Sequence, residues 1–98
     1  MNVEILKTKS KLKLSSTLDA NIVPSLKESL LTMIHENKPI EIDASTVQSI
    51  DTLCSQMLLS ASRTCHDQEI SFHVVKQSQK FIDVMKLLDM TELLEDAA

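Results

Sequence analysis

The chain of 98 residues contains no glycine, although average usage of about 7% would give roughly seven. This absence excludes the glycine-rich loops that bind phosphate groups, including P-loops and dinucleotide-binding fingerprints. Tight turns must instead form at other residues that tolerate them, and the candidates are residues 37–39 and Asp67-Gln68. The sequence therefore argues against the nucleotide-binding enzymes that depend on such loops.

Aromatic residues are almost as scarce. Tryptophan and tyrosine do not occur, and the only two phenylalanines are Phe72 and Phe81. The apolar fraction of 43% still suffices for a packed core, which must be aliphatic, and the length fits one domain over residues 1–98. The net charge of −4 argues against a partner bound through its phosphate backbone, so no nucleic acid is expected.

Cysteine occurs twice, as Cys54 and Cys65. If both lie on one helix, they share a face about 16 Å apart, whereas a disulfide needs Cα atoms within about 7 Å. Two unpaired thiols fit a reducing compartment, so we expect a cytoplasmic protein. The sequence shows neither a signal peptide nor a long apolar span, so we expect no export and no direct membrane insertion.

Hydrophobic periodicity predicts an α/β fold. Strands alternate with helices, which is typical of a mixed sheet of about four strands whose later strands are parallel. A turn is expected at Lys9-Ser10 and a polar loop at residues 15–19, and residues 70–75 read as a buried strand. The predicted strands are residues 3–9, 12–14, 40–43 and 70–75, and the predicted three to four helices are residues 19–37, 52–66, a helix capped by Ser78, and a short segment at 90–94.

Two features resemble parts of a metal site or a catalytic site but lack the other residues that such a site needs. His35, His66 and His73 are scattered over three predicted elements without ligand spacing, so no metal or other cofactor is expected. Cys54 lies in the first turn of a helix, where the dipole lowers a thiol's pKa and would suit the nucleophile of a small thiol enzyme. Its spacing to Leu58 makes it a core residue instead, and we expect no enzyme.

Asp51-Thr52 stands where a predicted strand and polar segment lead into the helix at residues 52–66. On composition alone, Asp51 is a helix cap and Thr52 an ordinary first-turn residue. The alternative is that the hydroxyl of Thr52 is an exposed group that a partner recognises. The residues around this pair favour the alternative.

Three segments together resemble a STAS domain, the module of bacterial anti-sigma factor antagonists. Leu18-Asp19 matches the pair that opens the family's first helix, and Ser78 through Met90 resembles its last helix. The segment from Ile40-Glu41-Ile42-Asp43 through Val47 to Ile50-Asp51-Thr52 resembles the family's strand, loop and Asp-Ser or Asp-Thr pair. The resemblance covers nearly the whole chain.

The resemblance implies a non-catalytic bacterial signalling module that binds a protein partner through the start of its second helix. Thr52 takes the place of the residue that a partner kinase phosphorylates, and the family usually has a glycine where this chain has Cys54, whose bulk is expected to hinder a kinase. The implied partner-binding residues are Asp19, Ser49, Asp51, Thr52 and Ser55.

Three kinds of partner follow from the resemblance. The first two are a serine/threonine-type anti-sigma kinase and a chemotaxis protein, the latter because the chain is similar to small STAS proteins encoded with chemotaxis genes. The alternative is the ATPase of a phospholipid ABC transporter, whose STAS subunit has a threonine at the contact. We place the signalling partners first.

Overall fold

The computed structural model describes residue 1 and residues 3–95. Its main sheet has four strands in the order β1-β2-β4-β6. β1 pairs antiparallel with β2, whereas β2, β4 and β6 are mutually parallel, so the sheet is mixed as predicted. The strands are β1 Val3–Ile5, β2 Ser10–Lys13, β4 Ile40–Asp43 and β6 Phe72–Val75.

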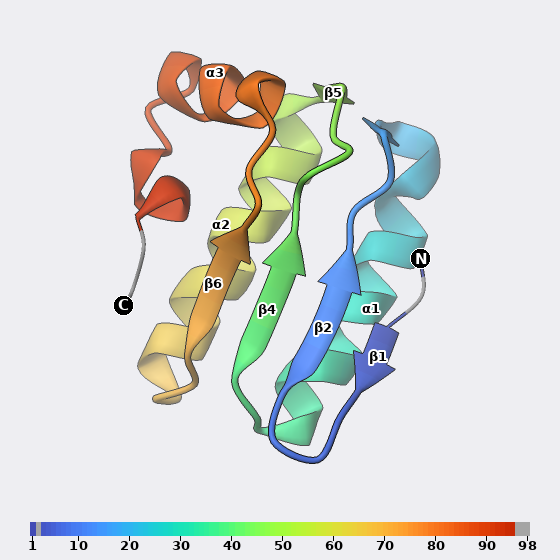
Figure 1. Ribbon diagram of the computed structural model, residues 1–98, viewed down its shortest axis with the longest axis vertical. Helices are drawn as coiled ribbons and strands as arrows, with labels where there is room; N and C mark the ends of the chain where they lie inside the picture. The colour runs from blue at the N-terminus through green and yellow to red at the C-terminus, as the bar shows by residue number, and fades with distance from the viewer. Residues whose placement is uncertain (2, 96–98) are drawn as a thin grey trace.

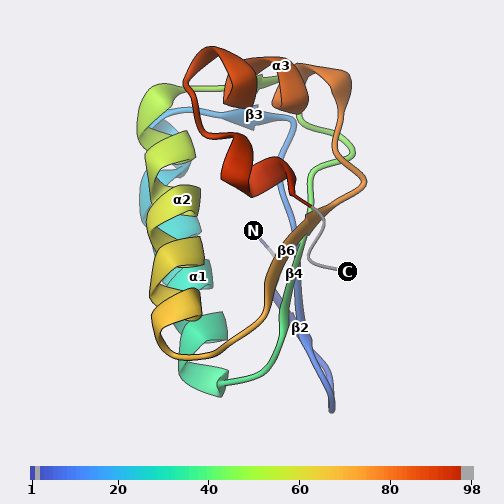
Figure 2. The same cartoon turned by 90° about the vertical axis from the view of Figure 1, so that its left-hand side faces the viewer.

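Two helices cover one face of this sheet, as Figures 1 and 2 show. They are α1 (Val23–Glu36) and α2 (Thr52–Asp67), and both run opposite to the parallel strands. A third helix, α3 (Gln79–Leu87), crosses the end of the molecule at which α1 and α2 begin, and two 3₁₀ turns, η1 (Ala20–Ile22) and η2 (Thr91–Leu94), complete the order. The core therefore lies between the sheet and one layer of helices.

Alternation along the central strands produces this two-layer arrangement. In β2 and β4, Leu12, Ile40 and Ile42 are buried, while Lys11 and Glu41 between them point to the uncovered face. The helices bury the positions that their periodicity predicts, such as Leu26, Leu58 and Phe81.

Turns without glycine form at residues that accept a left-handed backbone. Asn37 ends α1 with φ 58°, as expected for the segment before Pro39. Glu69, Lys76 and Asp89 also have positive φ, between 52° and 60°. A left-handed conformation is unfavourable for side chains such as those of Glu69 and Lys76, so the missing glycines carry a conformational cost.

The predicted first hairpin is wrong in its bounds. β1 ends at Ile5, and the chain reverses over residues 6–9, where the Leu6 N–H donates to the Lys9 carbonyl at 2.8 Å. Ser10, predicted in the turn, is instead a fully buried residue of β2. The apolar alternation at Val3 and Ile5 made the predicted strand too long, because the sequence has no glycine that would mark the turn at residues 6–9.

Two further predictions differ from the structure. The last strand of the sheet, β6, lies at the sheet edge and only Val74 is buried, so the expectation of a fully buried strand is wrong. Residues 15–19, predicted as a loop, contain β3 (Thr17–Leu18), which pairs with β5 (Ser49–Ile50) in a small second sheet. The predicted helices at 52–66 and after Ser78 are confirmed. α2 extends one residue beyond the predicted end, and Ser78 caps α3.

Candidate functional site

The small sheet of β3 and β5 brings two distant parts of the chain together at the start of the helices. The strands are parallel, and their register pairs Thr17 with Ser49 and Leu18 with Ile50. The N–H of Asp51 donates to the carbonyl of Leu18 at 3.0 Å, which extends the pairing by one bond. As a result Asp19 and Asp51, which directly follow the two strands, lie beside each other.

Both aspartates cap the helical segments that they precede. The carboxylate of Asp51 accepts a hydrogen bond from the Cys54 N–H at 2.8 Å, and that of Asp19 accepts one from the Asn21 N–H at 3.0 Å. A carboxylate at this position satisfies an unpaired helix N–H and interacts favourably with the helix dipole. The capping role of Asp51 is thus confirmed, and the pair places two negative charges at one end of the molecule.

Thr52 is the first residue of α2 and is exposed. Its hydroxyl makes no hydrogen bond to any residue that the structure describes, because Asp51 already provides the cap. Ser49 beside it is exposed, and Leu53 after it is a large apolar side chain with 51% of its surface exposed. We call Asp19, Ser49, Asp51, Thr52 and Leu53 the α2-start surface.

Leu53 was missed by the sequence analysis, which singled out only polar residues here. Its position in the helical repeat could have identified it. Leu53 comes one residue before the buried Cys54, so it lies about 100° around the helix from the buried face. Leu53 therefore adds an exposed apolar side chain to a surface that is otherwise polar.

Ser55, which the resemblance implied as a partner-binding residue, lies beneath this surface and not in it. Its side chain is 0% exposed, and its hydroxyl donates to the carbonyl of Asp51 at 2.9 Å. Serine within a helix commonly makes this bond to the carbonyl four residues earlier. The structure therefore brings together Asp19, Ser49, Asp51 and Thr52 and leaves Ser55 underneath them.

The thiol of Cys54 lies beneath the same surface. Cys54 is 0% exposed, and its Sγ donates to the carbonyl of Asp19 at 3.5 Å. Burial is the largest cause that raises the pKa of this thiol, which is about 12. The hydrogen bond and charge of Asp51 and the charge of Asp19 raise it further. The expected lowering by the helix dipole is overturned, because desolvation and two carboxylates outweigh it.

Two conclusions follow for Cys54. At neutral pH its thiol is protonated and inaccessible, which removes the basis of the thiol-enzyme alternative. Its side chain is also buried in the core, so its bulk does not cover the exposed Thr52 hydroxyl. Cys65 is likewise buried, burial raises its pKa, and both thiols are free.

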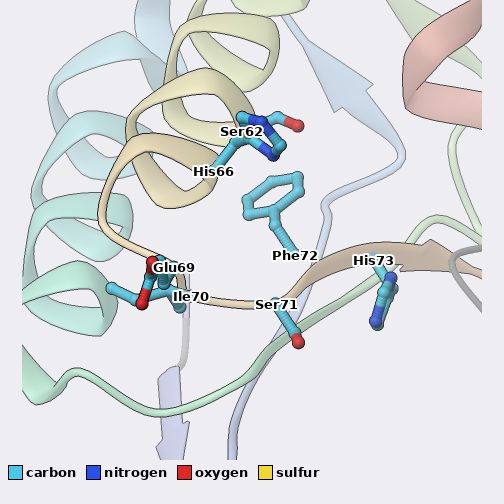
Figure 3. Close-up of a pocket in the computed structure, with 7 residues that line it drawn as sticks. All are labelled: Ser62, His66, Glu69, Ile70, Ser71, Phe72 and His73. Atoms are coloured by element: carbon cyan, nitrogen blue, oxygen red, sulfur yellow. The ribbon is translucent and has the colours of Figure 1, made fainter.

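A hollow of about 330 Å³ lies at the other end of α2, beside the edge strand β6. Figure 3 shows that Phe72 points toward His66, whereas His73 points to the opposite side of β6. The histidines that line the hollow are thus not directed at one point, and His35 lies on α1. Within residues 1 and 3–95, no group of three or more His, Cys, Asp or Glu side chains is placed to hold a metal ion. The hollow is lined by Ser62, His66, Glu69, Ile70, Ser71, Phe72 and His73.

Comparison with known proteins agrees with the fold. A family model described as "Mlab, STAS domain" matches residues 1–95, and a search of curated proteins gave no match. STAS domains are generally non-enzymatic modules that mediate protein–protein interactions. None of the described helices has the length and apolar character needed to cross a membrane. With a matched family model over almost its whole length and the mixed sheet described above, the chain belongs to the STAS domain family.

Proposed function

We propose that this protein is a non-catalytic module that binds a protein partner through the α2-start surface, and that phosphorylation of Thr52 switches this binding off. The observation that carries the proposal is the state of Thr52: its hydroxyl is exposed and bonds to none of the described residues, while Asp51 caps the helix. The fold therefore makes no use of the hydroxyl, which leaves it available to a partner or a kinase.

The electrostatics of the surface support a switch that acts on binding and not on folding. A phosphate at a helix N-terminus is favoured by the dipole by about 0.3–1 kcal/mol. Asp51 and Asp19 oppose it by a similar small amount in solvent, so the stability of the fold changes little. Burying the same charge against a partner without a matching arginine costs several kcal/mol, and about 3 kcal/mol is a hundredfold loss of affinity.

The partner is proposed in two forms. The first is a signalling protein, either an anti-sigma factor that acts as a serine/threonine kinase or a chemotaxis component. The second is the ATPase of a phospholipid ABC transporter, and the name Mlab carried by the matched family model is the observation that favours it. We also propose a cytoplasmic location, which the two free thiols support.

The test uses the purified product of the neighbouring gene, whether a kinase, a chemotaxis protein or a transporter ATPase. Thr52→Glu should abolish its binding with an almost unchanged melting temperature, and Thr52→Ala should fold equally well and keep binding or weaken it modestly. Thr8→Glu is the control, because Thr8 is exposed in the connection between β1 and β2, which Figure 1 shows at the end of the molecule opposite the start of α2. If Thr52→Glu binds like the parent protein, the interface lies elsewhere; if it unfolds the domain, Thr52 is a structural residue.

A further inference from the structure

A groove of about 440 Å³ is lined by residues of α1 and α2, which lie side by side in the helix layer (Figures 1 and 2). Its α1 rim is apolar, since Leu31 is 56% exposed and Ile34 is half-buried. On α2 the half-buried Met57 is followed by the polar residues Ser60, Thr64 and Gln68. Ala61 and Thr64 on α2 are small, so the crease between the helices stays open instead of being filled by side chains. The groove thus combines one exposed apolar rim with a floor of small side chains that lets another chain approach closely.

The groove carries charge of one sign. Among the described residues that line it, Lys27 is the only charged one, and it forms no ion pair within the described part of the chain. Lys27 lies toward the start of α1, so the positive charge stands at the end of the groove nearest the α2-start surface. An occupant with an acidic group at that end would be held by charge as well as by apolar contact.

We propose that this groove binds an amphipathic helix of a partner protein, with apolar side chains at every third or fourth position in the groove and an acidic residue at Lys27. The α2 residues from Met57 to Gln68 span about 16 Å, which matches a bound helix of about 11–14 residues. A second copy of the chain fits less well. The remaining helix, α3, exposes one large apolar side chain, Leu87, and not the row that would fill the groove.

The groove begins about one turn after Leu53, so the same partner can cover both this groove and the α2-start surface. The inference nevertheless goes beyond the proposed function and does not require Thr52, because a helical peptide alone is sufficient to occupy the groove.

Two synthetic helical peptides of about 14 residues test the proposal. Both carry leucine at every third or fourth position; one has two glutamates in its first turn and the other two lysines. Titration into ¹⁵N-labelled protein should shift the amide signals of Leu31, Met57 and Thr64. The glutamate peptide should bind about threefold more tightly than the lysine peptide, the effect of an exposed ion pair, and Lys27→Glu should reverse this preference.

A matched pair of variants separates the groove from general stickiness. Leu31→Asp should weaken peptide binding at least about tenfold through loss of an apolar contact, whereas Leu87→Asp, on the exposed face of α3, should leave it unchanged. Shifts confined to other surfaces, an equal loss with Leu87→Asp, or a charge preference independent of Lys27 would overturn the proposal. A dimer that Leu31→Asp dissociates would also overturn it, since the occupant would be a second copy. Thr52→Glu should not affect peptide binding, so failure here is distinct from failure of the proposed function.

Discussion

The buried thiol of Cys54 makes the stability of this protein depend on pH, and one substitution isolates the effect. The pKa of the thiol is raised from 9.0 to about 12 in the folded protein. Because the folded pKa lies above the unfolded one, the thiol's contribution is fully present below about pH 9. It is lost as the pH rises from about 9 to about 12, since the unfolded chain releases its proton first.

The size of the effect follows from the two pKa values. At about pH 10 an unfolded thiol with a pKa of 9.0 is mostly ionised, whereas the folded thiol remains protonated. The free energy of unfolding therefore falls by about 1.4 kcal/mol relative to a side chain that does not titrate. Cys54→Ser provides that side chain, because a hydroxyl of similar size keeps its proton throughout this range.

The assay is urea unfolding of the parent protein and Cys54→Ser, in a phosphine reductant, at about pH 7 and pH 10. The lysines and Cys65 are present in both proteins, so their titration cancels in the comparison. The parent should lose about 1.4 kcal/mol more than the variant. Equal losses would show that the thiol is not desolvated. A smaller loss in the parent would mean a lowered pKa, and would restore the thiol-enzyme alternative.

Three further predictions concern stability and can be measured by urea unfolding at neutral pH. Ser10→Ala should stabilise the fold by about 1 kcal/mol, because the buried hydroxyl has no hydrogen-bond partner in the described structure; a loss of stability would contradict this. Lys76→Gly should stabilise by about 0.5–1 kcal/mol by relieving its positive φ, whereas Lys80→Gly, in the first turn of α3, should destabilise by up to about 1 kcal/mol; equal effects would refute the argument from backbone strain. Asp51→Ala should cost about 1 kcal/mol and Asp51→Asn much less, because asparagine also caps helices; equal costs would mean that charge and not capping is what matters.

The elements with a continuous hydrophobic pattern were predictable from the sequence. The strand Ile40–Asp43 has the predicted bounds, and the start of α2 at Thr52 was predicted from Asp51 as a cap. Both depend on local signals, namely the alternation of a half-buried strand and the preference of aspartate for helix starts. The adjacency of Asp19 and Asp51 was expected only through the resemblance to the family.

The parts that could not be predicted depend on tertiary contacts. β3 and β5 have two residues each, which is too short for any periodicity, and they exist because they pair with each other across the fold. Ser10 looked like a turn residue because serine favours turns, but its register in β2 buries it. For Ser55 a local signal existed, since it lies four residues after Asp51 and a helical hydroxyl can bond to that carbonyl.

The pairing of β3 with β5 also makes the α2-start surface depend on the tertiary fold. Thr17 and Ser49 are separated in the chain by α1 and β4, so their pairing closes a long loop at a cost in chain entropy. A chain in which β3 and β5 are not paired therefore does not place the two aspartates side by side next to Thr52. The proposed partner would therefore recognise the paired strands as one folded unit and would not recognise either strand alone.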